Sequence, residues 1–381
     1  MSQSRREPGT GDQSFLQVAA VRLGALTAAA GFSESERAAA VSLLDELLRP
    51  WGEELVGEVP RMSSDIGDDH FPIELSLALG GRGVAPEVRV LFEARTAGSS
   101  MMERWRVGQE LCARLESRHG ANLQGLRLIE DLFVPLHPRA RYAIWHSVCL
   151  RRQTKPKFKI YLNPQAQGEG RAPVVISQAM GRLGFERACD EATMYRRPSD
   201  RYKFFSLDLA GSAEARVKTY KVHPGATRIE IEVELAAATS YSPGVLDAFW
   251  RIIAAGDGPF DRLAPSTYLS WRAGDGERPS SGTLHFPLRA HVDDDQVARE
   301  RICRFLPDTD RAIYESAVGA FARRSLADGV GLHAYVSLAI DRGAPRVTIY
   351  LAPEVYAVAP SRGAASSVEL PAPLRVAGMA S

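Results

Sequence analysis

The segment "RVKTYKVHP" at Arg216–Pro224 decides the fold that we expect for this chain of 381 residues. With the two-residue period of a β-strand, Arg216, Lys218 and Tyr220 share one face, and Val217 and Thr219 lie on the other. Related strand-like segments recur along the chain: "EVRVLFEA" with Arg89, "KFKIYLNP" with Lys159 and Tyr161, "GTLHFP" with Thr283 and His285, and "RVTIYLAP" with Thr348 and Tyr350. The pattern indicates a repeated structural unit.

Each of these segments follows a second strand-like run that contains a serine. The five serines are Ser76, Ser147, Ser206, Ser270 and Ser337. Five pairs of strands joined by short turns predict ten antiparallel strands. Such strands can close into a barrel that leaves no free edge, and a barrel of this strand number encloses a lumen. A propeller or a two-domain sandwich is the alternative architecture.

Helical patterns fill the intervals between the strand pairs. "MMERWRVGQELCARLESRHG" and "SPGVLDAFWRIIAAG" repeat apolar residues at three-to-four spacing, and residues 14–51 are also helical, with a capping box at Ser33 or Ser35. Long helices between hairpins favour the barrel over the alternatives. We therefore expect an α+β fold of residues 14–359, with a disordered segment 1–13 and a flexible tail 360–381.

The composition limits the classes of partner. The formal net charge of +1 gives no overall attraction to nucleic acid or to an anionic membrane, so any positive site must be local. Long apolar runs are absent, and the four cysteines, Cys112, Cys149, Cys189 and Cys303, form no CxxC pair. This usage predicts a reduced, cytoplasmic protein without disulfides.

Five cations are expected to point into the lumen from four of the hairpins: Arg89, Lys159, Arg216, Lys218 and Arg346. All six lysines of the chain lie between residues 155 and 221, which fits either a solvated surface or an anion site. Two cations about 4 Å apart repel each other by about 4 kcal/mol at an effective dielectric of about 20. A cluster inside a lumen therefore requires a polyanion such as a diphosphate.

Three tyrosines, Tyr161, Tyr220 and Tyr350, lie on the same strand faces as these cations. Their rings either fill the barrel or surround a carbocation, which aromatic faces stabilise by about 1 to 2 kcal/mol in a desolvated site. The two interpretations remain open at this point.

These segments resemble the dimethylallyltryptophan synthase family of aromatic prenyltransferases, in a shorter bacterial version. The resemblance covers roughly residues 60–356 and is carried by "SDIGDDHFPIELSLAL", "VRVLFE", "KIYLNP", "RVKTY" and "VTIYLAPEVY". It implies the ABBA fold, in which five ααββ units surround a ten-stranded antiparallel barrel. It also implies transfer of a prenyl group from dimethylallyl diphosphate to an indole ring, commonly that of tryptophan.

The resemblance also implies roles for residues. Arg89, Lys159, Arg216 and Lys218 match the diphosphate-binding cations, and Tyr161, Tyr220 and Tyr350 match the tyrosine shield of the carbocation. Glu74 matches the glutamate that accepts a hydrogen bond from the indole N–H, which stabilises the positive charge that develops on the ring. His146 stands where fungal members have a lysine proposed to take up the ring proton.

The chain departs from the fungal pattern at three places. Thr283 and His285 replace a glutamine and a tyrosine, and Arg346 replaces another tyrosine. We expect a thinner shield that includes His285 and a larger cation set that includes Arg346. The prenylated ring position stays open.

No metal motif is found. "DDDQV" at Asp293–Val297 lacks the last aspartate of DDxxD and is expected to begin a helix, where acidic residues are favourable. Lysine and arginine would replace Mg²⁺, so neither a metal nor a cofactor is expected to be required. The expected substrates are dimethylallyl diphosphate and L-tryptophan, bound by a monomer or homodimer that interacts with neither nucleic acid nor membrane.

Two alternatives concern function. The acceptor can instead be a cyclic dipeptide, another indole derivative or a hydroxynaphthalene. In a different class of protein, alternating basic and aromatic residues form a single-stranded nucleic-acid-binding β module. Lys221, on the opposite strand face from Lys218, is expected to be dispensable.

Overall fold

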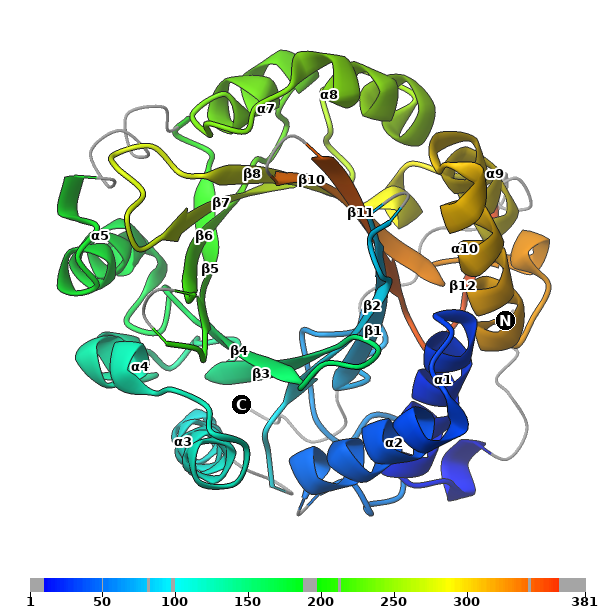
Figure 1. The fold of residues 1–381 in the computed structure, drawn as a ribbon, viewed down its shortest axis with the longest axis horizontal. Helices are drawn as coiled ribbons and strands as arrows, with labels where there is room; N and C mark the ends of the chain where they lie inside the picture. The colour runs from blue at the N-terminus through cyan, green and yellow to red at the C-terminus, as the bar shows by residue number, and fades with distance from the viewer. Residues whose placement is uncertain are drawn as a thin grey trace.

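The ten predicted strands form a closed antiparallel barrel in the computed structural model, which describes residues 10–49, 51–80, 83–96, 100–187, 197–211, 214–341 and 344–362. Their order around the barrel is β1-β11-β10-β8-β7-β6-β5-β4-β3-β2 (Figure 1). The strands are β1 (Ile73–Leu79), β2 (Glu87–Glu93), β3 (Ile144–Leu150), β4 (Lys157–Leu162), β5 (Arg201–Asp208), β6 (Arg216–Val222), β7 (Ser266–Arg272), β8 (Ser281–Phe286), β10 (His333–Asp341) and β11 (Ala344–Leu351). The predicted barrel is confirmed, and the propeller and the sandwich are excluded.

Pairing between the first and last hairpins closes the barrel. Leu75 of β1 pairs with Leu351 of β11, and the two strands stay in register as far as Leu79 and Val347. The two-stranded sheet of β9 (Gly329–Val330) and β12 (Ala359–Pro360) lies apart from the barrel. All ten barrel strands therefore have partners on both sides, as a sheet without edges requires.

Helices surround the barrel on its outer side (Figure 1). They are α1 (Phe15–Ala29), α2 (Glu34–Leu48), α3 (Met101–His119), α4 (Gln124–Ile129), α5 (Ala172–Arg182), α7 (Arg228–Leu235), α8 (Pro243–Phe249) with the π-helical turn Trp250–Ala254, α9 (Asp295–Phe305) and α10 (Asp308–Phe321). Ser33 caps α2 in a capping box with Glu36, and Asp294 caps α9 by accepting from the Val297 N–H. "DDDQV" is thus a helix start, as predicted.

The hydrophobic core lies between the barrel wall and the helices. Ile160, Val217 and Leu269, which face outward from their strands, are buried in this layer. Helix α3 lies so close to β3 that a Cβ atom on Gly108 would be 2.1 Å from Ile144 Cγ2. Close packing of this kind leaves the inner strand faces free to line a separate space.

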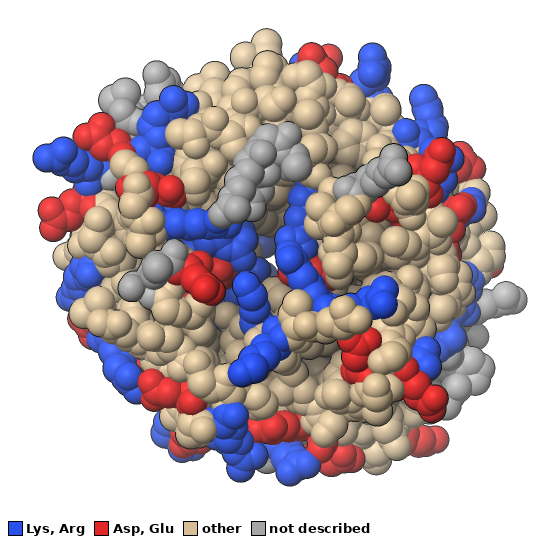
Figure 2. Space-filling model, in the orientation of Figure 1, with Lys and Arg blue, Asp and Glu red and all other residues tan. Residues whose placement is uncertain are grey.

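The inner faces of the strands carry most of the polar and aromatic side chains that the sequence placed there. Arg89, Lys218 and Tyr161 are partly exposed although their strand neighbours are buried. Partial exposure at these inward positions indicates that the lumen contains accessible space, although other inward side chains, such as Lys159 and Tyr220, are buried. Figure 2 shows Lys and Arg side chains gathered around a hollow in the face that lies over the barrel.

The cysteines, the helices and the chain ends were also subjects of prediction. Cys112, Cys149 and Cys303 are free thiols, and Cys189 lies outside the described residues. None of the described helices is long and apolar enough to cross a membrane. Most of the two ends, 1–13 and 360–381, also lies outside the described residues, so their predicted disorder stays a prediction.

Candidate active site

The five predicted cations meet at the end of the lumen where the hairpins turn. Each lies near the start of the second strand of its hairpin: Arg89 on β2, Lys159 on β4, Arg216 and Lys218 on β6, and Arg346 on β11. We call these five residues the cation cluster. The positive charges of Arg216 and Arg89 lower the pKa of Lys159, and the charge of Arg89 lowers the pKa of Arg346. These members of the cluster therefore lie close enough to interact electrostatically.

Burial and mutual repulsion destabilise the positive charges of three members of this cluster, Lys159, Lys218 and Arg346. Burial lowers the pKa of Lys218 well below its usual value, and the charges of Arg216 and Lys159 lower it further. Burial also lowers the pKa of Lys159. For Arg346, burial together with the charge of Arg89 lowers the pKa to about 10. The cluster is therefore electrostatically prepared for a polyanion.

Two carboxylates inside the cluster were missed by the sequence analysis. Glu87 of β2 contacts Arg89 Nε at 2.5 Å, Arg151 Nε at 2.6 Å and Arg346 at 3.2 Å. Burial alone would raise the pKa of Glu87, but the surrounding cations outweigh burial and hold it far below its usual value. Asp208 of β5 accepts from Arg216 Nε at 2.7 Å. These carboxylates fix the positions of the arginines before any ligand binds.

Next to the cations, aromatic rings run around the lumen from strand to strand. Tyr220 contacts Tyr161 at a centroid distance of 5.8 Å and Tyr268 at 4.0 Å, and His285 stacks on Tyr335 at 4.2 Å. We call the whole set the aromatic belt: Trp145, Tyr161, Phe204, Tyr220, Tyr268, His285, Tyr335 and Tyr350. Tyr268 and Tyr335 are two rings of this belt that the sequence analysis did not name.

The missed rings share a sequence signal. Trp145, Phe204, Tyr268 and Tyr335 each stand two residues before the serine that marks the first strand of a hairpin, and Glu74 occupies this position in the first hairpin. Because a residue and its second neighbour share a strand face, all five point to the same side as their serines. Reading the two strands of each hairpin together would have found them.

Glu74 lies on β1, next in the barrel order to β11, which carries Tyr350. Burial raises the pKa of this carboxyl to about 8, and the nearby charges of Arg289 and Lys203 offset part of the rise. Arg289 lies over the ring of Tyr335 at 4.3 Å and donates to the Asp68 carboxylate at 2.7 Å. Glu74 thus places a carboxyl near the aromatic belt, with Arg289 and Lys203 as the nearby cations.

His146 does not reach the lumen, which corrects its predicted role. Its ring stacks on Phe92, and its Nε2 lies 3.3 Å from Cys112 Sγ of α3. Burial lowers the pKa of His146 to about 3. It is the neighbour of Ser147, which faces inward, so the alternation of the strand turns His146 toward the helices.

Lys221 is not a spare surface residue either. It is buried between β6 and α7, where its Nζ donates to Glu234 at 2.7 Å and lies over the Tyr202 ring at 5.8 Å. Its removal would leave Glu234 buried without this cation, so we expect Lys221 to matter for stability although it lies outside the lumen.

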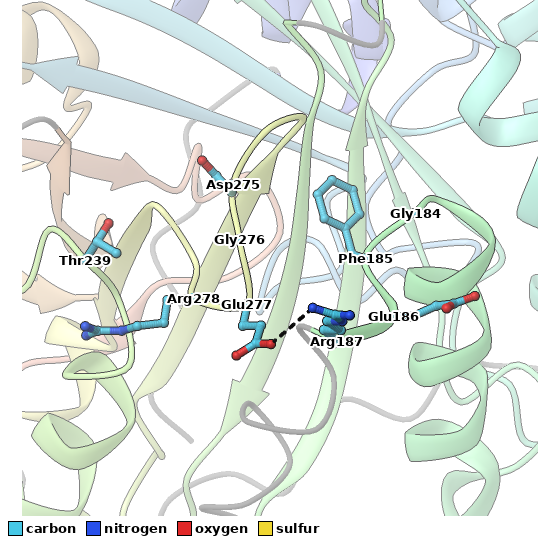
Figure 3. Close-up of a pocket in the computed structure, with 9 residues that line it drawn as sticks. All are labelled: Gly184, Phe185, Glu186, Arg187, Thr239, Asp275, Gly276, Glu277 and Arg278. Atoms are coloured by element: carbon cyan, nitrogen blue, oxygen red, sulfur yellow. Dashed lines mark ion pairs between the residues drawn. The ribbon is translucent and has the colours of Figure 1, made fainter.

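A pocket of about 830 Å³ lies outside this site (Figure 3). It is lined by Gly184–Arg187, which follow α5, by Thr239, and by Asp275–Arg278 of the β7–β8 turn. Arg187 and Glu277 approach each other across it at 3.9 Å, and both side chains are exposed. The pocket holds none of the predicted site residues.

Groups of three or more His, Cys, Asp or Glu side chains arranged to hold a metal ion do not occur in the part of the chain that the structure describes. The two lumen carboxylates nearest the cations, Glu87 and Asp208, are each engaged by arginine.

Comparison with known proteins agrees with this geometry. Residues 13–232 match the family model for tryptophan dimethylallyltransferase. The crystal structure of PriB with product diphosphate is 34% identical, with a TM-score of 0.84, and the match covers 92% of this chain and 99% of PriB. The 5-dimethylallyltryptophan synthase from Streptomyces coelicolor is 30% identical, with a TM-score of 0.83 and coverage of 90% and 99%.

A third similar structure is a complex with two bound ligands. The 6-dimethylallyltryptophan synthase from Micromonospora olivasterospora, in complex with DMASPP and Trp, is 30% identical to this chain. Its TM-score is 0.84, and the match covers 91% of this chain and 99% of that one.

Proposed function

Because the chain belongs to the tryptophan dimethylallyltransferase family, we propose that it transfers a dimethylallyl group from dimethylallyl diphosphate to a ring carbon of L-tryptophan. The observation that carries the proposal is the order of groups in one lumen, where the cation cluster adjoins the aromatic belt and Glu74. This order matches a donor with an anionic head and an apolar tail, next to an aromatic acceptor. The other acceptors and the nucleic-acid module are not favoured.

The cation cluster binds the diphosphate in this proposal. Arg89, Lys159, Arg216, Lys218 and Arg346 neutralise its oxygens, which also removes the repulsion among the cations. When the C–O bond breaks, its electron pair leaves with the diphosphate. The cations stabilise this leaving group more strongly than the intact ester, because negative charge grows on it in the transition state.

The aromatic belt then shields the allylic cation. Tyr161, Tyr220 and Tyr350 present ring faces to the carbon chain, and His285 with the two added tyrosines extends the enclosure. A ring within about 6 Å of a desolvated cation contributes about 2 kcal/mol. The rings also exclude water, which would otherwise convert the cation to an alcohol.

Glu74 orients the acceptor in this proposal. As a carboxylate it accepts the indole N–H, and it stabilises the positive charge that the ring acquires when one of its carbons attacks the allylic cation. The hydrogen bond to Glu74 fixes the orientation of the indole relative to the allylic cation, and this orientation decides which ring carbon attacks the cation.

We further propose that the reaction needs no metal ion and takes place in the cytoplasm. The cation cluster can neutralise a diphosphate without Mg²⁺, and the free thiols of Cys112, Cys149 and Cys303 fit a reducing compartment.

The test is to incubate the protein with L-tryptophan, dimethylallyl diphosphate and EDTA. We expect a product heavier by one dimethylallyl unit, and NMR then identifies the prenylated carbon. A protein that gives no product with tryptophan or any other indole or phenol would contradict the proposed enzyme. Activity that disappears with EDTA and returns with Mg²⁺ would contradict the metal-free reaction.

A further inference from the structure

We propose that His285 is the base that accepts the ring proton of tryptophan after the new carbon–carbon bond has formed. The inference rests on the proposed function and adds one catalytic residue to it. His285 lies on β8, between β7 and β10, and its partly exposed side chain faces the lumen from within the aromatic belt.

The reaction requires a proton acceptor near the indole, and His146 cannot supply it from the far side of the barrel wall. Glu74 is occupied by the indole N–H in the proposed complex. Glu87 and Asp208 are held by arginines, and a bound diphosphate keeps Lys159 and Lys218 in their ammonium form. Among the lumen groups that the structure describes, His285 remains as a neutral base beside the rings.

One ring nitrogen of His285 is closed off from the lumen. Nδ1 is buried and has no hydrogen-bond partner among the described residues, which leaves Nε2 as the nitrogen that can meet a substrate. Burial lowers the pKa of His285 well below its usual value, with further lowering by Lys203 and Arg289, so the ring is neutral and one nitrogen carries a lone pair.

The surrounding rings fix the direction of the imidazole. It stacks on Tyr335 with an interplanar angle of 12°, meets Tyr350 edge-on at 4.7 Å and lies 5.1 Å from Tyr268. Contacts on three sides hold the imidazole in one orientation within the belt. This geometry is what a positioned base requires.

The barrel order places His285 at a suitable distance from Glu74. The strands β1, β11, β10 and β8 are neighbours in that order, so the two residues lie three strand spacings apart, about 14 Å along the wall. Tyr350 lies between them, since its ring contacts His285 and the charge of Glu74 raises its pKa. An indole whose N–H binds Glu74 can cross Tyr350 with its benzene carbons toward His285.

A pair of ring electrons forms the bond to the allylic carbon, and the attacked ring carbon still bears its hydrogen. The electrons of that C–H bond return to the ring and restore its aromaticity, while the proton moves to Nε2 of His285, because Nδ1 is closed off by surrounding atoms. The imidazole, which carries its first proton on Nδ1, becomes an imidazolium and passes the added proton to water when the product leaves.

The test uses L-tryptophan deuterated on its ring carbons, with His285→Phe as the main variant because phenylalanine keeps a ring in the belt but has no lone pair. We expect the wild type to show no primary isotope effect, since bond formation limits its rate. His285→Phe should lose about 100-fold or more in kcat. Its remaining turnover should show a primary isotope effect, and diphosphate release should exceed prenylated product.

Two further proteins serve as controls. His146→Gln changes the outward-facing histidine of the same barrel and should show no isotope effect. His285→Gln, checked for its fold by circular dichroism, should repeat the isotope effect of His285→Phe. A His285→Phe protein with wild-type turnover, or one whose turnover and diphosphate release fall together without an isotope effect, would overturn the role of His285. A wild type that prenylates no tryptophan would instead overturn the proposed function.

Discussion

The carboxyl of Glu74 can accept the indole N–H only when it is ionised. Because burial raises its pKa to about 8, it is largely protonated at pH 6.5 and largely ionised at pH 9.5. We expect kcat/KM for tryptophan to rise through this interval. Glu74→Gln should abolish the rise and lower kcat/KM at pH 9.5 by about 10- to 150-fold, the equivalent of a charged hydrogen bond of about 1.5 to 3 kcal/mol.

Stability should change with pH in the opposite direction from activity. The folded state raises the pKa of Glu74 above its ordinary value of 4.5, so its contribution is most favourable below pH 4.5 and is lost as the pH rises through about 8. Urea unfolding should therefore show Glu74→Gln gaining stability relative to the wild type between pH 5 and pH 9. An unchanged difference between the two proteins would show that Glu74 is not desolvated.

Glu87 is the internal counter-ion of the cation cluster. In Glu87→Gln the three arginines Arg89, Arg151 and Arg346 lose their shared carboxylate, and we expect the free energy of unfolding to fall by about 3 to 5 kcal/mol. Added pyrophosphate should then raise the Tm of the variant more than that of the wild type, because it replaces the missing anion.

The matched control for this variant is Glu277→Gln, which removes one partner of the exposed ion pair with Arg187. Its effect should stay below about 1 kcal/mol, with an unchanged response to pyrophosphate. If pyrophosphate raised the Tm of Glu87→Gln and of the wild type by the same amount, the proposal that the anion replaces the Glu87 carboxylate would be contradicted.

At the scale of one element, the two faces of β6 have different roles. The face with Lys218 lines the lumen and is expected to bind the donor, and the face with Lys221 packs against α7 and is expected to contribute to stability. Lys218→Ala removes a cation whose burial and like-charged neighbours are unfavourable, so we expect unchanged or higher stability and at least a tenfold rise in KM for dimethylallyl diphosphate. Lys221→Ala leaves Glu234 buried without its partner and should cost about 3 to 5 kcal/mol of stability.

The double variant Lys221→Met with Glu234→Leu distinguishes a lost ion pair from lost packing. Replacing both charges with apolar groups of similar volume should restore most of the stability. Denaturant titration of the wild type, Lys218→Ala, Lys221→Ala and the double variant measures the stability differences. Steady-state kinetics measures KM for dimethylallyl diphosphate. A Lys221→Ala protein as stable as the wild type would contradict the structural role of this pair.

The same strand shows what the sequence could and could not predict. Alternation with period two assigned Arg216, Lys218 and Tyr220 to the lumen correctly, because one buried face fixes the register of a strand. It could not identify the partner of Lys221, since Glu234 lies on a helix whose rotation depends on packing. His146 was misplaced because its spacing from Lys159 was matched without regard to its parity with Ser147.

For the barrel as a whole, the repeated hairpins predicted the topology, since five similar strand pairs can satisfy all their edges by closing on themselves. Glu87 was missed for a different reason. Arg89 stands two residues along the same strand face, but Arg346 can be recognised as a partner of Glu87 only when the first and last hairpins are known to be close. Closure of the barrel is what brings them together.

That closure makes diphosphate binding a property of the whole molecule, because the cation cluster is drawn from four hairpins. Inorganic pyrophosphate at about 100 times its Kd should stabilise the fold by about 2.7 kcal/mol, or about 3 °C in Tm for a chain of this length. The shift should shrink when NaCl is raised from about 0.1 to 1 M, which shortens the Debye length from about 10 to 3 Å. Differential scanning fluorimetry, with Lys159→Gln/Arg216→Gln as the weakened variant, measures both effects. If sulfate at equal ionic strength gave the same shift in both proteins, the ions would act on the general surface and the barrel would hold no diphosphate site.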